Sequence, residues 1–263
     1  MIAMERIDEV LDGLKEVVDD AIASGDRIGY FAALYRQVTI KVDDGIKAGK
    51  FFDDNDRMSR FDAKFGNRYF SALDNWRQNK TGVPKTWQDA FDATRRNDLG
   101  VVQHLLLGVN AHINRDLAAA AAEVSPGHKI EDLREDFLKI NSILKVVLRD
   151  IETALGRVSL FTRYIDAALG PLDDEILGFS IVKARDEAWD YAVELAHQSE
   201  SAKTITLKQL DSNARNLGRL VIDLGGPLNA LLSFRTKMPG PSEVIRTLND
   251  AKLDKVLKRA VPV

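Results

Sequence analysis

Apolar residues recur at three- and four-residue steps along most of this chain, and that spacing constrains the fold more than any other feature. The first segment shows it clearly, with apolar residues at Ile7, Val10, Leu11, Leu14, Val17 and Val18. This is the stripe of an amphipathic helix, and similar stripes follow in nearly every later segment. Strand-like alternation occurs only at residues 39–42, inside a longer helical period. The sequence therefore predicts an all-α fold.

Short breaks rich in glycine and proline separate these segments. Clear breaks fall at residues 24–26, 49, 81–84, 125–127, 170–171, 225–227 and 239–241. Short connections between long helices favour one compact domain, and the chain shows no internal repeat and no long polar linker. We expect a single all-α domain over residues 1–263, with about eight to ten helices around a central helix at 99–124. The one weak subdivision falls near residue 170.

Two segments carry finer local predictions. A helix is expected over residues 57–79, with a break near Gly66. Thr86 is followed by Asp89 three positions later, which is the spacing of a capping box at the start of a helix. We therefore expect a short helix that starts at Thr86 and ends near Arg95.

The composition argues against several classes of protein. With 37 basic and 40 acidic residues the formal net charge is −3, so nothing marks the chain as a binder of nucleic acid or anionic lipid. The absence of cysteine excludes disulfides, thiolate nucleophiles and cysteine-ligated metals, and it fits a reducing compartment. The N-terminus is charged and amphipathic, unlike a signal peptide, and no apolar run reaches the ~18 residues of a membrane span. We expect a cytoplasmic protein; the sequence does not fix its oligomeric state.

The most unusual stretch is residues 103–117, QHLLLGVNAHINRDL, where polar residues stand among leucines. On an α-helix, His112 and Asp116 lie one turn apart on one face, a spacing that can hold a metal ion between an imidazole and a carboxylate. The same spacing occurs where an aspartate hydrogen-bonds to a histidine and fixes its tautomer, and both interpretations stay open. His104 lies roughly 12 Å from His112 along the axis, too far to bind the same ion on a regular helix.

Three further residues of this stretch need a structural reason. Gly108 costs a helix roughly 1 kcal/mol relative to alanine, which points either to close helix packing or to room for a ligand beside the histidines. Asn110 and Asn114 lie one turn apart on another side of the helix. Asparagine is a poor helix former and needs hydrogen-bond partners when buried. We therefore expect an internal polar network around Asn110.

Two more clusters supply candidate ligand-binding residues. Asp62, Asn67 and Arg68 fall in FDAKFGNRYF, where they either line a pocket or tie helices together. Arg185 and Trp189 fall in ARDEAWDYA, one turn apart, a spacing suited to stacking of a guanidinium on an indole.

We expect other polar and aromatic residues near these clusters to lie outside the ligand-binding set. Asp186 and Asp190 form a DxxxD pair that suits a bound cation, an arginine partner or a solvated surface. We expect Asp136 and Asn141 to extend the polar network by facing the central helix. The aromatic residues between 30 and 35 have the helical spacing of core residues rather than of an aromatic cage.

Three motifs together resemble a bacterial family of unknown function. They are QHLLLGVNAHINRDL, the upstream RMSRFDAKFGNRY and the downstream ARDEAWDYA. The resemblance covers the chain from about Tyr30 to His197. It implies a helical domain and brings no established activity.

The central stretch is also similar to a helix of the zinc-dependent phospholipase C and nuclease superfamily, which has the pattern LGxxxHxxxDLxxPxH. Leu107-Gly108 is followed here by His112 and Asp116, and the resemblance implies that these two residues are metal ligands. Beyond them the chain departs from the pattern, because alanines at 118–122 replace the proline and the histidine. Four histidines in all cannot furnish that superfamily's trinuclear site. The resemblance therefore implies one divalent ion at most, zinc or iron.

Two functional hypotheses follow. In the first, the protein is an enzyme that acts on a small, partly apolar molecule between helices, with His104, His112 and Asp116 as catalytic residues. Metal-activated water would make it a hydrolase, whereas a metal-free histidine and aspartate would suit isomerisation or cyclisation. The expected ligand-binding residues are Asp62, Asn67, Arg68, Asn110, Arg185 and Trp189. In the second hypothesis, the chain is a non-catalytic ligand-binding or interaction domain with a buried structural polar network.

Overall fold

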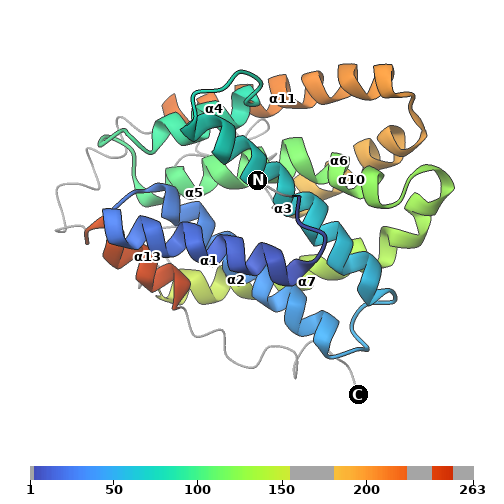
Figure 1. Ribbon diagram of the computed structural model, residues 1–263, viewed down its shortest axis with the longest axis horizontal. Helices are drawn as coiled ribbons and strands as arrows, with labels where there is room; N and C mark the ends of the chain where they lie inside the picture. Colours follow the sequence, from blue (N-terminus) through green and yellow to red (C-terminus); the bar gives the residue numbers. More distant parts are fainter. Residues whose placement is uncertain (1–2, 155–180, 224–238, 251–263) are drawn as a thin grey trace, which may run out of the picture.

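The computed structural model describes residues 3–154, 181–223 and 239–250, and every regular element in them is helical (Figure 1). The predicted all-α fold is confirmed for this part of the chain, whereas the predicted subdivision near residue 170 lies outside it. The elements are α1 (Ile7–Ser24), α2 (Ile28–Lys47), α3 (Asn55–Arg77), α4 (Lys85–Ala93), α5 (Val101–Asn110), the π-helical turn η1 (Ala111–Leu117), α6 (Ala118–Val124), the 3₁₀ turn η2 (Gly127–Leu133), α7 (Arg134–Ala154), α10 (Ile181–His197), α11 (Glu200–Asp223) and α13 (Pro241–Asn249).

The predicted central helix is present and runs from α5 through η1 into α6. Neighbours pack along it on several sides: α10 and α3 against η1 and α6, α11 against α5 and η1, and α4 against α5 and η1. The alanines at 118–122 are all buried in this packing. Their small side chains let the neighbouring helices approach closely.

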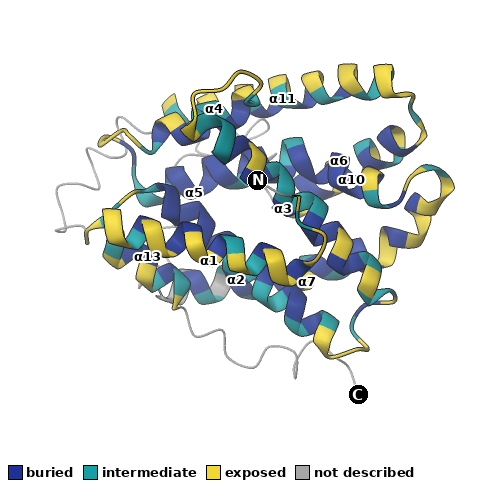
Figure 2. Ribbon diagram, viewed as in Figure 1, coloured by how far each residue is buried: buried dark blue, intermediate teal, exposed yellow. Residues whose placement is uncertain are grey.

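α1, α2 and α13 form an adjacent layer, with α1 packed on α2 and α13 in contact with both (Figure 1). The predicted stripe of α1 is buried except for Leu11, which is half-buried, and the opposite side of the helix is exposed (Figure 2). α2 is buried over much more of its surface, because it also contacts α3, α5 and α7. α2 therefore lies between α1 and the central helix, and it packs against both.

The central helix changes geometry where its polar residues are densest. Residues Ala111–Leu117 form a π-helical turn, in which hydrogen bonds span five residues in place of four. The His112 ring stacks on Phe65, whereas Asp116 accepts a hydrogen bond from Trp87. Trp87 lies between the two residues, because its ring centroid is also 6.1 Å from that of His112, so whether His112 and Asp116 act together stays a prediction.

Two helical glycines allow close approach between elements. A Cβ at Gly108 would lie 2.4 Å from Cγ of Phe31, so the glycine lets this ring pack onto the central helix. Of the two reasons considered for Gly108, the structure thus supports close packing. Gly66 lies within an unbroken α3, so the predicted break there is wrong. A Cβ at Gly66 would lie 2.9 Å from Val10 and 3.4 Å from Oη of Tyr35.

The start of α4 is capped by a residue far along the chain. Asp211 of α11 accepts hydrogen bonds from the backbone N–H groups of Lys85 (2.8 Å) and Thr86 (3.1 Å). The Thr86 hydroxyl donates to the Asp211 carbonyl oxygen, and Asp89 pairs with Arg215. The predicted capping box is wrong, because a distant carboxylate satisfies the donors that a local cap would have satisfied.

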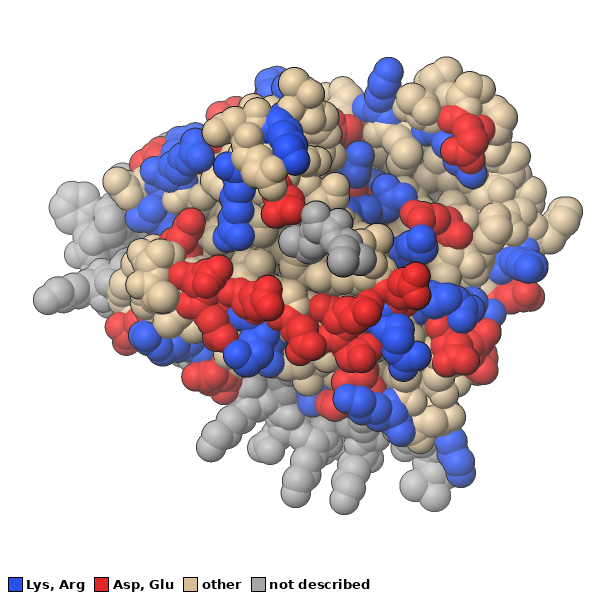
Figure 3. Space-filling view, viewed as in Figure 1, with Lys and Arg blue, Asp and Glu red and all other residues tan. Residues whose placement is uncertain are grey.

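Acidic side chains of α1 form a band across one face of the molecule, with lysines and arginines around it (Figure 3). The exposed acidic residues of α1 are Asp8, Glu9, Asp12, Glu16, Asp19 and Asp20. Among the described helices, none is both long enough and apolar enough to cross a membrane.

Candidate functional site

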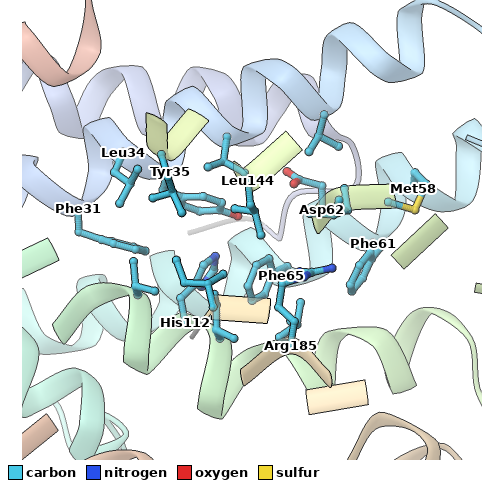
Figure 4. Close-up of a pocket in the computed structure, with 18 residues that line it drawn as sticks. Phe31, Leu34, Tyr35, Met58, Phe61, Asp62, Phe65, His112, Leu144 and Arg185 are labelled. Carbon is cyan, nitrogen blue, oxygen red and sulfur yellow. The ribbon is translucent and has the colours of Figure 1, made fainter. Parts of the chain in front are cut away.

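An apolar cavity of about 80 Å³ lies where α2, α3, η1, α7 and α10 meet (Figure 4). This is room for roughly five to eight waters, or for one small organic group. Most of the wall is aliphatic or aromatic, and it includes Phe31, Leu34, Met58, Phe61, Phe65 and Leu144. Four polar side chains also line the cavity, namely Tyr35, Asp62, His112 and Arg185.

His112 lies among aromatic rings. Its imidazole stacks on Phe65 with ring centroids 3.5 Å apart, and the edge-on ring of Tyr35 lies 4.4 Å away. Neither ring nitrogen of His112 has a hydrogen-bond partner. Burial lowers the pKa of His112 well below its usual value. The imidazole is therefore neutral, and one ring nitrogen can donate to a bound molecule while the other accepts.

Asp62 is a buried carboxyl without a partner. The residue is 8% exposed, and its Oδ2 atom is buried and makes no hydrogen bond. Burial raises the pKa of Asp62 to about 7, with a further contribution from the charge of Asp43. Near neutral pH the group is thus present in both protonation states. It can donate a hydrogen bond when protonated and accept one in either state.

Tyr35 supplies a buried hydroxyl that makes no hydrogen bond of normal geometry, although the Thr39 side chain lies near enough to lower its pKa slightly. Burial raises the pKa of Tyr35 well above its usual value, and the neighbouring charge of Asp62 raises it further. The hydroxyl from α2 and the Asp62 carboxyl from α3 point toward one another in the close-up (Figure 4). These two groups form one polar side of the cavity.

Arg185 reaches the cavity from α10. Its Nε donates to Oδ1 of Asn141 and its Nη2 to the carbonyl oxygen of Phe137, both at 2.6 Å. The guanidinium carbon lies 4.2 Å from the centroid of the Phe137 ring. Burial lowers the pKa of Arg185 to about 9, and the charge of Asp186 opposes that shift. The side chain therefore remains a cation at neutral pH.

These polar groups offer complementary chemistry in a mostly apolar space. A neutral imidazole, a carboxyl with a pKa of about 7, a hydroxyl and a guanidinium face one cavity. A carboxyl that titrates near neutral pH suits the transfer of protons to and from a bound molecule. The arrangement can bind an apolar body, hydrogen-bond its polar group and move a proton.

Asp116, which was predicted to act with His112, lies in a separate buried network. Its Oδ2 accepts a 2.6 Å hydrogen bond from Nε1 of Trp87, and its Oδ1 pairs with Arg115. Arg115 also lies 4.0 Å from Asp211 of α11. Both carboxylate oxygens of Asp116 thus have protein partners, which is the behaviour of a structural aspartate.

His104 does not line the cavity with His112. It is buried on α5, and its ring centroid lies 5.6 Å from that of Tyr30. Burial lowers the pKa of His104 to about 4, and the charge of Arg27 lowers it further. His104 therefore lies apart from His112, whereas His112 and Asp116 both adjoin Trp87.

Asn67 and Arg68 tie elements together outside the cavity. The Asn67 amide binds both backbone groups of Met4, accepting from its nitrogen at 2.9 Å and donating to its oxygen at 2.7 Å. Arg68 pairs with Glu123 of α6 at 3.1 Å. Of the two roles considered for this cluster, these two residues fit the structural one, while Asp62 lines the cavity.

Asn110 forms the polar network that was expected around it. Its Nδ2 donates to the carbonyl oxygen of Ala214 at 2.7 Å, and its Oδ1 accepts from Asn114 at 2.9 Å. The side chain thereby joins α5 to α11. It does not line the cavity.

Trp189 lies beside the cavity wall without being part of it. Its ring centroid is 5.0 Å from that of Phe137, and the guanidinium over the indole belongs to Arg134, at 5.8 Å. Arg185 lies over Phe137 instead. The predicted stacking of Arg185 on Trp189 is therefore wrong.

Asp136 and Asn141 have different roles. Asp136 accepts hydrogen bonds from the backbone N–H of Asp53 (2.7 Å) and from Arg57 (2.9 Å), so it anchors the chain before α3 to α7 rather than facing the central helix. Asn141 holds Arg185 at the cavity. The carboxylates of Asp186 and Asp190 are on exposed residues.

Tyr35 is the cavity residue that sequence reasoning missed. Its helical spacing from Phe31 is typical of core packing, and both residues are indeed buried. A buried tyrosine hydroxyl normally has a polar partner, which was the available signal. The sequence does not show that its polar neighbour, Asp62, comes from another helix.

Metal binding stays a prediction. Within the part of the chain that the structure describes, no group of three or more histidine, aspartate or glutamate side chains is placed to hold an ion. Of the two predicted ligands, Asp116 has Trp87 and Arg115 as partners, whereas the His112 nitrogens have none; the Trp87 ring lies against both residues.

One comparison with known proteins gives a match. A family model described as "Family of unknown function (DUF5995)" matches residues 7–224. No curated protein and no solved structure matches the chain. The matched range includes all five elements around the cavity, but it brings no activity with it.

Proposed function

This chain belongs to the DUF5995 family of unknown function, and we propose that it binds a small, largely apolar molecule with a polar group in the cavity between α2, α3, η1, α7 and α10. One observation carries the proposal. Buried polar atoms of Tyr35, Asp62 and His112 lack hydrogen-bond partners and belong to side chains that line this cavity. Leaving a buried polar group unpaired costs about 1–3 kcal/mol. A bound molecule that pairs with these atoms offsets that cost.

The apolar wall sets the other requirement. Rings and aliphatic chains on five elements favour an apolar body by removing its surface from water, at about 25 cal/mol for each Å² buried. The polar groups then fix its orientation. A few placed polar groups on an apolar wall are typical of small-molecule sites.

Binding of ring-sized probes tests this proposal. Benzyl alcohol, benzamide, benzoate and benzylamine share one ring and differ in their polar group. Saturation-transfer NMR should detect at least one of them on the folded protein. The variant Leu144→Trp places a large side chain in the cavity wall and should abolish the signal.

A matched substitution controls for nonspecific effects. Leu207 of α11 is half-buried like Leu144, but it does not line the cavity. Leu207→Trp should therefore keep the binding signal. If no probe binds to the wild type, or if Leu144→Trp still binds, this cavity is not a ligand site.

Acid–base catalysis is a second candidate, and the pKa of Asp62 near 7 favours it. A carboxyl with that pKa takes up and releases protons at neutral pH, and the neutral His112 lines the same cavity. The natural reactions are isomerisation or cyclisation of the bound molecule. This candidate keeps His112 from the original hypothesis and replaces Asp116 by Asp62.

Proton abstraction can be measured on a simple carbon acid. Phenylacetone has an apolar ring and exchangeable protons beside a carbonyl group. Wild-type protein in deuterium oxide should accelerate deuterium incorporation at that carbon, and Asp62→Asn should lose most of the acceleration. Equal exchange rates with wild type, variant and buffer alone would remove this candidate and leave binding as the function.

A further inference from the structure

Arg185 is a buried cation without a carboxylate partner. The residue is 3% exposed, and within the described part of the chain no carboxylate lies within ion-pairing distance of its guanidinium. Its protein contacts are the neutral oxygens of Asn141 and Phe137 and the face of the Phe137 ring. These contacts orient the guanidinium without an ion pair, and within the described residues Asp186 is the charge that acts on it.

A second arginine that contacts α7 does have a carboxylate partner and serves as a comparison. Arg57 has a side chain 13% exposed, and it lies 2.9 Å from the fully buried carboxylate of Asp136. Buried charges are normally paired, because removing a charge from water is costly. Arg185 departs from that rule at the point where its side chain lines the cavity.

The geometry leaves donor capacity for a ligand. Nε and Nη2 of Arg185 are occupied by Asn141 and Phe137, whereas Nη1 makes no hydrogen bond in the described residues. A guanidinium nitrogen is a strong donor to a carboxylate oxygen, and such charge-assisted bonds are about twice as strong as neutral ones. In Figure 4 the guanidinium lies beside Phe61 and Phe65, at the aromatic part of the wall.

We propose that the molecule bound in this cavity is a small organic carboxylate, whose anionic group pairs with Arg185 and whose apolar body lies among Phe61, Phe65 and Leu144. This inference rests on the proposed function and specifies its ligand class. The cavity offers a single guanidinium for the anionic end, which suits a monoanion better than a phosphate dianion. Asp62, when protonated, donates a hydrogen bond to the same ligand without adding negative charge.

Matched probes on the wild-type protein test the charge of the ligand. Benzoate and benzamide have nearly the same shape and differ by one negative charge, and benzylamine is a cation. We expect calorimetry at neutral pH to show benzoate binding at least tenfold more tightly than benzamide, with benzylamine weakest. Phenylphosphonate tests a phosphate-like dianion and should bind less tightly than benzoate. A benzamide affinity equal to or above that of benzoate, or tighter binding of phenylphosphonate than benzoate, overturns the proposal.

Substitutions then test the residue. Arg185→Gln should bring the benzoate-to-benzamide affinity ratio close to one and leave benzamide binding within about twofold, because the amide retains polar contacts without the charge. Arg134→Gln removes the same charge from an exposed position over Trp189 and should leave the ratio unchanged. An unchanged ratio in Arg185→Gln overturns the proposal.

A third variant covers the case in which Arg185→Gln does not fold. Arg185→Lys keeps the charge and should retain a preference for benzoate, and loss of that preference in folded protein counts against a charge interaction. The preference in the wild type decides the ligand class even if both variants fail to fold. If no probe binds at all, the proposed function fails; if neutral probes bind without a preference for benzoate, only the carboxylate inference fails.

Discussion

Buried polar groups beside the π-helical turn η1 differ in whether they have hydrogen-bond partners. On one side, the carboxylate of Asp116 is fully buried, and its two oxygens are satisfied by Trp87 and Arg115. On the other side, His112 reaches a cavity where neither of its nitrogens has a partner, and Asp62 of α3 lacks one as well. The same seven-residue turn thus carries an aspartate whose two oxygens have partners and a histidine whose two nitrogens have none.

This difference separates stability from function. A satisfied buried network holds helices in place, and breaking it exposes uncompensated polar groups. Unsatisfied groups destabilise the fold on their own, and under the proposed function a bound molecule pairs with those that line the cavity. Substitutions on the Asp116 side should therefore reduce stability, whereas those on the cavity side should leave stability unchanged or raise it.

The largest effect is expected for Asp116→Ala. The substitution leaves the buried N–H of Trp87 and the charge of Arg115 without their acceptor, and we expect a loss of about 3–5 kcal/mol in the free energy of unfolding. Urea denaturation followed by circular dichroism measures it. A loss under about 1 kcal/mol would contradict the structural role of Asp116.

Trp87→Phe provides a graded control on the same side. It removes the indole N–H and keeps most of the ring packing, so the expected loss is smaller, about 1–3 kcal/mol. A double-mutant cycle with Asp116→Ala should show strong coupling between the two residues.

The next effect concerns the pH dependence of stability at Asp62. Its pKa is raised from 3.8 to about 7 in the folded protein, so the folded state binds this proton more tightly than the unfolded state. The protonated Asp62 carboxyl therefore contributes to the free energy of unfolding. This contribution is fully present below about pH 4 and is lost as the pH rises to about 7. We expect wild type to lose about 3 kcal/mol more than Asp62→Asn between pH 4 and pH 8.

Denaturation at a series of pH values measures this difference. The difference between the two proteins isolates Asp62 from all other titrating groups. Parallel pH profiles for the wild type and Asp62→Asn would show that Asp62 has an ordinary pKa and a partner that balances its charge.

A smaller effect is expected for His112→Leu. The substitution removes two unpaired ring nitrogens and keeps an apolar side chain among aromatic rings, so the free energy of unfolding should change by no more than about 1 kcal/mol. Probe binding should weaken in the same variant. A loss of stability as large as that of Asp116→Ala would show that the two sides of η1 do not differ.

The smallest expected effect concerns metal content. Because Asp116 is held by Trp87 and Arg115, we expect His112→Ala to leave the zinc and iron content of the purified protein unchanged. Elemental analysis of both proteins checks this. Stoichiometric metal in the wild type that disappears in His112→Ala would restore the hypothesis of a metal site.

Much of the fold could be predicted because helical stripes are local. α1 ends at Ser24 and α2 at Lys47, at or within two residues of the predicted breaks, since glycines follow closely on both. Failures occurred where distant residues replaced local signals. Asp211 caps α4 in place of Thr86, and Gly66 packs beside Val10 without breaking α3.

The candidate site was predicted in part. Asp62, His112 and Arg185 were named from the sequence and line one cavity, although they come from three elements. Asp116 and His104 were predicted to act with His112, but the structure gives Asp116 protein partners in Trp87 and Arg115 and places His104 beside Tyr30. Neither residue lines the cavity.

The sequence by itself determined that this chain is helical, which face of α1 is buried, and that the stretch around His112 is unusual. These properties follow from apolar periodicity and backbone chemistry within a few turns. Only the tertiary structure decided which buried polar groups have partners. A partner's position depends on how whole helices pack, and no local spacing in the sequence encodes it. Helix packing places Trp87 beside Asp116, whereas it places no partner beside Oδ2 of Asp62.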